Sequence, residues 1–155
     1  MPGQIDAQLA KLNITLPKPG GVAGNYVPYQ QIGDLIFISG QVTVGPDGLE
    51  YCGKLGQDYS VEEGQAAARL CAINIVAQLK AACGGDLDRV VKCAKITGFV
   101  NATADFEQHP SVINGASDLF VEVFGDKGKH ARAAVGVGSL PFNVAVEVEA
   151  IFQIG

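Results

Sequence analysis

The sequence predicts a single α+β domain in which two helices cover one face of a mixed β-sheet. Segments of strand and helix character follow one another in the order β-β-α-β-α-β-β, and no linker or low-complexity stretch divides them. The 155 residues, with 48% hydrophobic content, suffice for one core. We therefore expect residues 1–155 to form one domain, in which residues 1–23 are an N-terminal extension with a short helix.

The extension is expected to contain one helix and one loop. Ile5, Leu9 and Leu12 recur at helical spacing, which predicts a helix over residues 4–13. Residues 17–25 read Pro-Lys-Pro-Gly-Gly-Val-Ala-Gly-Asn, a composition typical of a loop.

Two strands follow the extension, over residues 29–32 and 35–44. Gly33-Asp34 between them suits a tight hairpin turn. The turn residues 45–48, Gly-Pro-Asp-Gly, end the second strand.

The two long helices are marked by their ends. Ser60-Val61-Glu62-Glu63 has the spacing of a capping box and predicts the start of the first helix, which Gly84-Gly85 ends. The second helix is expected over residues 110–124, with proline in its first turn and Gly125 after its last. A strand rich in Val, Ile and Phe, residues 89–100, lies between the two helices.

The last two strands, about residues 131–137 and 144–152, are predicted to form a terminal hairpin around a proline turn. Residues 35–38 of the earlier strand are apolar without alternation, as expected of a strand that is covered on both faces. The cover of the second face is expected to be another copy of the chain. The alternative is that the short N-terminal helix covers this face by itself.

Charge and hydropathy exclude several classes of function. The net charge is −5, and the 11 lysines and arginines are scattered rather than clustered, which argues against a nucleic acid partner. No apolar run approaches the roughly 20 residues that cross a bilayer. The N-terminus lacks the basic start and apolar centre of a secretory signal. These features predict a soluble cytoplasmic protein without a membrane partner.

The cysteines and histidines show no pattern of a metal site or a catalytic triad. The four cysteines are far apart, form no C-x-x-C pair and are expected to be buried reduced thiols: Cys52, Cys71, Cys83 and Cys93. His109 and His130 are expected to be surface or capping residues. The Gly-rich residues 125–129 and 136–138 match neither a phosphate loop nor a dinucleotide fingerprint, so no cofactor is implied.

The most informative residues are an arginine and two glutamates set in the apolar final strands. Charges in such places are costly to bury unless they are paired or bind a ligand. Arg132 could therefore pair with Glu147 or Glu149, and either carboxylate could instead be a solvated edge charge. Strand alternation places both glutamates on the face opposite the neighbouring valines. If the hairpin turns near Ser139-Leu140, Glu147 lies across from Arg132 with room for a water, whereas a shift of one residue would separate them.

Several short motifs, in this order and spacing, resemble the reactive intermediate deaminase superfamily. This superfamily is also called RidA or YjgF-like and was formerly labelled the L-PSP endoribonuclease family. The resemblance runs over residues 24–152 and is carried by residues 34–41 (Asp-Leu-Ile-Phe-Ile-Ser-Gly-Gln), the helix 65–84 with Asn74, Ala131-Arg132, Leu140-Pro141, and residues 146–151 (Val-Glu-Val-Glu-Ala-Ile). It implies a chorismate-mutase-like fold and a homotrimer with three clefts between subunits.

The resemblance also implies an activity, the hydrolysis of reactive enamines and imines such as 2-aminoacrylate to 2-keto acids and ammonia, without a cofactor. Arg132 matches the family's arginine that binds the substrate carboxylate. An arginine suits this task because its planar fork donates two parallel hydrogen bonds and stays charged. Glu147 matches the glutamate that orients or activates water in the family.

Further substrate-binding residues are implied by the same resemblance. Tyr26 is at the position of a tyrosine that closes the cleft of an adjacent subunit; the alternative is a tyrosine packed at a loop base. Ser39 and Gly40 would offer a backbone amide to the anion. Asn114 matches a polar residue of the site, or is a helix-surface amide, and Ala134 would act through its main-chain carbonyl.

This chain departs from the family pattern after the arginine. Ala133-Ala134 stands where better-known members have Ser-Cys, and the approach to the arginine, residues 125–129, is one residue longer. These differences indicate a divergent subgroup with its own substrate preference. Two other functions stay open: a non-catalytic protein or regulator that binds a small keto acid or amino acid, and an endoribonuclease or translation inhibitor. The acidic charge and the missing histidine pair argue against the latter.

Overall fold

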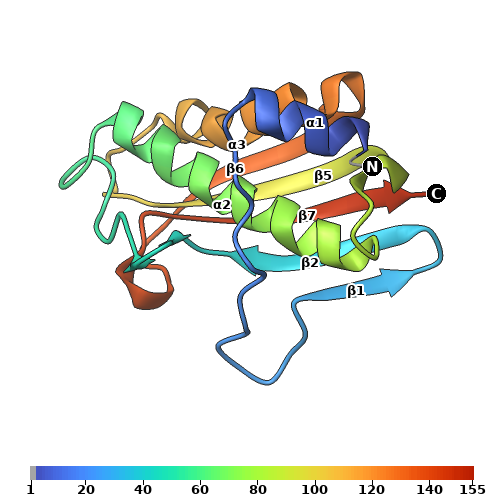
Figure 1. The fold of residues 1–155 in the computed structure, drawn as a ribbon. Helices are drawn as coiled ribbons and strands as arrows, with labels where there is room; N and C mark the ends of the chain where they lie inside the picture. The colour runs from blue at the N-terminus through green and yellow to red at the C-terminus, as the bar shows by residue number, and fades with distance from the viewer. Residues whose placement is uncertain (1–2) are drawn as a thin grey trace.

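A computed structural model describes residues 3–155 and shows a layer of helices on one face of a five-stranded sheet (Figure 1). The strand order is β1-β2-β7-β5-β6. The strands are β1 (Tyr29–Ile32), β2 (Leu35–Gln41), β5 (Val90–Asn101), β6 (Ala131–Val137) and β7 (Val146–Ile154). A short separate hairpin joins β3 (Val44–Gly45) to β4 (Gly48–Leu49). The sheet is mixed, so the predicted fold class is confirmed.

In the described part of the chain three α-helices form the helical layer: α1 (Gln4–Lys11), α2 (Val61–Ala82) and α3 (His109–Phe124). Helix α2 begins at the predicted capping box, in which the Glu63 amide donates to Ser60 Oγ at 3.2 Å and the Ser60 amide donates to Glu63 Oε1 at 3.0 Å. Short 3₁₀ turns complete the chain: η1 (Leu87–Arg89), η2 (Gly125–Gly128) and η3 (Pro141–Asn143). The core lies between α2, α3 and the facing side of β2, β5 and β7.

The predicted terminal hairpin is wrong. Strand β6 pairs with β5 in parallel, whereas β7 is antiparallel to β5 on one side and to β2 on the other. The physical reason is helix α3, which connects β5 to β6 as a crossover and returns the chain in the same direction beside β5. Strand β7 then takes the other side of β5, and β6 remains at the edge of the sheet.

Helix α1 packs on the helical layer and leaves the other face of the sheet open (Figure 1). Asp6 forms an ion pair with Lys80 of α2 at 3.0 Å, and Gln8 Nε2 donates to the Glu122 carbonyl of α3 at 2.8 Å. The alternative in which the N-terminal helix covers the second face is therefore wrong. On that open face Phe37 is 38% exposed and Val135 is 42% exposed.

The remaining sequence predictions concern thiols and membranes. All four cysteines are free; Cys71, Cys83 and Cys93 are buried as predicted, but Cys52 is exposed. Within residues 3–155 no helix is long and apolar enough to cross a membrane. The same part of the chain holds no cluster of three or more His, Cys, Asp or Glu side chains that could bind a metal ion.

Candidate functional site

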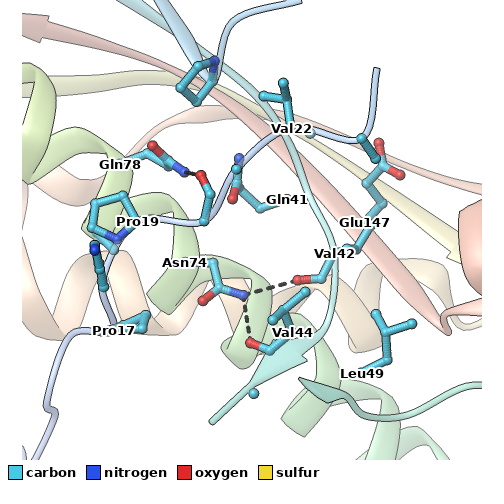
Figure 2. A pocket seen from close by; sticks show the side chains of 18 of the residues that line it. Pro17, Pro19, Val22, Gln41, Val42, Val44, Leu49, Asn74, Gln78 and Glu147 are labelled. Carbon is cyan, nitrogen blue, oxygen red and sulfur yellow. Dashed lines mark hydrogen bonds between the residues drawn. The ribbon is translucent and has the colours of Figure 1, made fainter. Parts of the chain in front are cut away.

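A cavity of about 1020 Å³ lies where the N-terminal extension crosses α2, beside the end of β2 and the start of β7 (Figure 2). One wall is the strap, residues 15–23, which follows α1. The other walls come from β2, the β3–β4 hairpin, α2, the turn at Pro141-Phe142, and Glu147 of β7. Three of the predicted site residues line this cavity: Tyr26, Gly40 and Glu147.

Two amides of α2 hold the cavity walls together (Figure 2). Asn74 Nδ2 donates to the carbonyls of Val42 at 3.1 Å and Val44 at 3.0 Å, which fixes the chain after β2. Gln78 Nε2 donates to the Gly20 carbonyl at 3.1 Å and ties the strap to the helix. Asn74, which belongs to one of the motifs shared with the family, therefore stabilises the wall of the cavity.

Glu147 is the carboxylate of this cavity. Its neighbours Val146 and Val148 are fully buried toward the helices, so Glu147 points to the opposite face of the sheet, as the alternation predicted. It is half-buried and lies against Gly40. Burial raises the pKa of the Glu147 carboxyl above the usual glutamate value, and the nearby charge of Glu149 raises it further. A carboxylate with a raised pKa is a stronger base than an ordinary glutamate and so is better suited to taking and returning a proton.

Both hydrogen-bond donors of Ser39, its hydroxyl and its backbone amide, already donate to carbonyls of the protein. Its hydroxyl donates to the Val27 carbonyl at 2.7 Å and its amide donates to the Pro28 carbonyl at 3.0 Å. The backbone amide expected at Ser39-Gly40 can thus come only from Gly40, which lies in an irregularity of the β2–β7 pairing. Tyr26, at 51% exposure, lies at the cavity wall rather than packed in a loop base.

Arg132 lies on the other side of the sheet, against helix α3. Its register partner on β5 is the fully buried Ile96, so its side chain shares the helical face. Nη1 donates to Asn114 Oδ1 at 2.8 Å and to Ser117 Oγ at 3.1 Å, and Nη2 donates to the Pro110 carbonyl at 3.3 Å. All three acceptors are neutral.

No carboxylate within residues 3–155 forms an ion pair with Arg132. The alternative in which Arg132 pairs with Glu147 or Glu149 is therefore wrong. Asn114, predicted as a site residue, contacts the guanidinium directly. The charge of Arg132 is held in place without being neutralised, which leaves it able to bind an anion.

Two residues that the sequence reasoning missed support Arg132. His130 Nδ1 bonds to the Gly128 carbonyl at 2.6 Å, and its Nε2 bonds to Ser117 Oγ at 2.8 Å. A carbonyl can only accept, so Nδ1 carries the proton, Nε2 accepts from the Ser117 hydroxyl, and that oxygen accepts from Arg132. Burial lowers the pKa of the His130 imidazole; the bond to Gly128 opposes this shift, and the Arg132 charge adds to it.

Sequence spacing contained a signal for both missed residues. His130 stands two residues before Arg132 and so shares its strand face, while Ser117 is one helical turn after Asn114. The half-buried His130 is therefore not a surface residue.

Arg132 and Glu147 do not meet within one protomer. They are on opposite faces of the sheet, β5 separates their strands, and the register partner of Arg132 on β7, through Ile96, is Ala150. Strand spacing and rise put their backbones roughly 14 Å apart. The expected cross-strand pair with a water between them is wrong for a single chain. The site residues instead form two groups: Arg132 with Asn114, and Glu147 with Gly40 and Tyr26.

Ala134 belongs with the Arg132 group. It is half-buried on the helical face and pairs with Gly98 of β5. Because β6 is an edge strand, alternate backbone groups along it point away from the sheet. A main-chain carbonyl of this strand is thus placed at the border of the protomer.

Comparisons with known proteins identify relatives over almost the whole chain. The family model described as "YjgF/chorismate mutase-like, putative endoribonuclease" matches residues 6–153. Protein TCP17 of Trypanosoma cruzi is 46% identical over 153 residues, which cover 98% of this chain and 95% of TCP17.

Two solved structures show the range of the likeness. Atu1372 of Agrobacterium tumefaciens, a protein of unknown function, superposes with a TM-score of 0.92 at 44% identity, covering 97% of this chain and 92% of Atu1372. The E. coli protein TdcF, crystallised with bound serine, superposes with a TM-score of 0.62 at 26% identity, covering 89% of this chain and 94% of TdcF. The chain belongs to the YjgF family within the reactive intermediate deaminase (RidA) superfamily.

Proposed function

We propose that this protein hydrolyses reactive imines and enamines to 2-keto acids and ammonia, without a cofactor, in clefts between the subunits of a homotrimer. The observation that carries the proposal is that the positive charge of Arg132 has no negatively charged partner. Its guanidinium donates to three neutral acceptors, Asn114, Ser117 and the Pro110 carbonyl, so the charge is not neutralised. A substrate carboxylate is the natural partner of such a group.

Glu147 supplies the proton transfers of the reaction. An enamine first becomes the neutral imine when its methylene carbon takes a proton and its nitrogen gives one up, so that the C=C bond is replaced by a C=N bond. A water oxygen then bonds to the imine carbon, the C=N electron pair moves to nitrogen, and the proton lost by the water passes through Glu147 to that nitrogen. In the second half the hydroxyl proton follows the same route, the C–N bond breaks, and ammonia leaves as the C=O bond forms. The raised pKa of Glu147 favours this exchange.

Each cleft would combine the two groups of residues from neighbouring subunits. Arg132 and Ala134 lie at the sheet edge formed by β6, whereas Glu147, Gly40 and Tyr26 lie at a cavity toward the β2 side. The open face of the sheet, with Phe37 and Val135 exposed, offers the apolar surface for assembly. Packing the edge of one copy against the cavity of the next would bring Arg132 to Glu147.

Mixed oligomers test both the activity and the composite cleft. Arg132→Ala and Glu147→Ala are each expected to abolish keto acid formation from enzymatically generated 2-aminoacrylate. When the two variants are denatured, mixed in equal amounts and refolded together, about a quarter of the clefts carry both intact residues, so about a quarter of the wild-type rate should return. A site within one chain predicts no recovery. Equal rates with and without the wild-type protein would rule out the activity for this substrate.

The second candidate is a protein that binds a small amino acid or keto acid without turnover. TdcF, which shares the fold, was crystallised with serine. A ligand-dependent rise in melting temperature that is lost in Arg132→Ala, with no imine hydrolysis by the wild type, would favour this candidate over the enzyme.

A further inference from the structure

The cavity at Glu147 is larger than a small enamine needs. Its volume of about 1020 Å³ is at the upper end of the roughly 300–1,000 Å³ of pockets that bury drug-sized ligands. The side chain of 2-aminoacrylate is a single methylene carbon. If the reacting carbon sits beside Glu147, most of the cavity is left for the rest of the substrate.

The walls that extend away from Glu147 are apolar. Val22 of the strap lies across from Val44 and Leu49, and Pro17 and Pro19 close the far side from Glu147 (Figure 2). Among the residues 3–155 that line the cavity, two have a carboxylate or an amine in the side chain: Glu147 and the exposed Lys18.

The amide side chains of the cavity lining donate hydrogen bonds within the protein: those of Gln41, Asn74 and Gln78. Both donor bonds of Asn74 go to the chain after β2, and the amide of the buried Gln78 holds Gly20. The strap is also held at its start, where Leu16 packs against the core. A ligand portion that enters between strap and sheet therefore meets a largely apolar surface whose strap is held at Leu16 and Gly20.

We infer that the strap turns this cavity into an apolar side-chain subsite, so that the substrates are imines and enamines of amino acids with bulky apolar side chains. The inference rests on the proposed function and names its substrate class. The carboxylate is held by Arg132 of a neighbouring subunit, the imine carbon faces Glu147, and the side chain extends toward Val44, Leu49 and the strap. Such a pocket discriminates by burying methylenes, each of which is worth about 10-fold or more in kcat/KM.

The test compares imines made by an amino acid oxidase from leucine and from alanine. Wild-type protein is expected to hydrolyse the leucine-derived imine with a kcat/KM at least about 10-fold higher. Val22→Trp fills the subsite and should remove this preference, because kcat/KM falls at least about 10-fold more for the leucine-derived imine than for the alanine-derived one. The control is Val121→Trp on α3, because Val121 and Val22 are both 37% exposed and only Val22 lines the cavity. Leu49→Trp, from the opposite wall, should repeat the effect of Val22→Trp if that variant folds poorly.

Binding of the products separates the failure of the inference from that of the proposed function. By calorimetry, 4-methyl-2-oxopentanoate should bind more tightly than pyruvate, and Val22→Trp should abolish the difference. Hydrolysis of both imines at equal kcat/KM, or equal loss of both in Val22→Trp, would overturn the subsite and leave the deaminase standing. Tighter binding of the larger keto acid without any hydrolysis would support the subsite and refute the deaminase.

Discussion

Gly40 of β2 and Glu147 of β7 are in such close contact that no side chain fits between them. A Cβ atom built on Gly40 would lie 2.9 Å from Cδ of Glu147 and closer still to its Oε2. Gly40 does not adopt a left-handed backbone, so the need for glycine here is steric. The missing side chain at position 40 therefore sets where the proposed proton-transfer group lies.

Gly40→Ala is expected to reduce imine hydrolysis at least about tenfold, because the methyl group pushes the Glu147 carboxylate away from its place. The displaced atoms are the end of a flexible side chain, so the free energy of unfolding should fall by less than about 1 kcal/mol. Steady-state kinetics and urea unfolding measure the two effects. Gly138→Ala is the matched control, since a Cβ on Gly138 meets nothing within 4 Å. Unchanged activity in Gly40→Ala would show that the position of Glu147 does not matter.

The pH dependence of the rate should report the raised pKa of Glu147. As the proposed general base, Glu147 must be ionised, so kcat/KM is expected to fall as the pH drops through a pKa higher than that of an ordinary glutamate. Glu149→Gln removes the neighbouring negative charge and should move this acid limb to lower pH. An acid limb that stays in place in Glu149→Gln would contradict the assignment.

The raised pKa of Glu147 should also appear in the pH dependence of the free energy of unfolding, where it lowers stability at neutral pH. Because the folded protein holds the Glu147 proton more tightly than the unfolded chain, the folded state loses stability as pH rises from the unfolded pKa through the raised folded one. Glu147→Gln carries no such penalty. It should be more stable than wild type at neutral pH and equal to it at a pH below the ordinary glutamate pKa, as measured by urea unfolding at both values. A Glu147→Gln protein that is less stable at neutral pH would refute this account of the pKa.

Asn114→Asp tests whether Arg132 must stay unpaired. The change is nearly isosteric and places a carboxylate about where Asn114 Oδ1 now accepts from Nη1 at 2.8 Å. The new ion pair should leave stability within about 1 kcal/mol but raise KM for a carboxylate substrate about tenfold or more, because the anion site is already neutralised. Asn13→Asp adds the same charge at an exposed position of the N-terminal extension and should leave KM unchanged. A normal KM in Asn114→Asp would exclude Arg132 as the carboxylate anchor.

The open face of the sheet should hold the assembly together. Phe37→Glu places a charge on this face and is expected to convert the proposed homotrimer into a monomer, because a buried unpaired charge costs several kcal/mol. Val121→Glu makes a matched change on the helical side, where Val121 is 37% exposed against 38% for Phe37, and should leave the trimer intact. Sedimentation equilibrium measures both masses. A wild-type protein that sediments as a monomer would refute the shared cleft.

Helix starts and strand faces could be predicted from the sequence because the residues that determine them lie within a few positions of one another. The capping box at Ser60 and Glu63 placed the start of α2, and alternation placed Glu147 opposite its neighbouring valines. The same local reasoning failed for the terminal hairpin. Proximity in sequence suggested that β6 pairs with β7, whereas the crossover through α3 pairs β6 with β5.

The sequence by itself determined the main helices and strands, the fold class, the family, and which residues carry charge in apolar strands, but not the short β3–β4 hairpin, which it assigned to a longer strand and a turn. The tertiary structure decided the strand partners, and with them the separation of Arg132 from Glu147, the contact of Glu147 with Gly40, and the closure of the cavity by the strap. Helix caps and alternation depend on neighbouring residues. Strand order and cavity walls depend on which distant segments bury their apolar faces together, and many arrangements of the same elements satisfy the local pattern equally well.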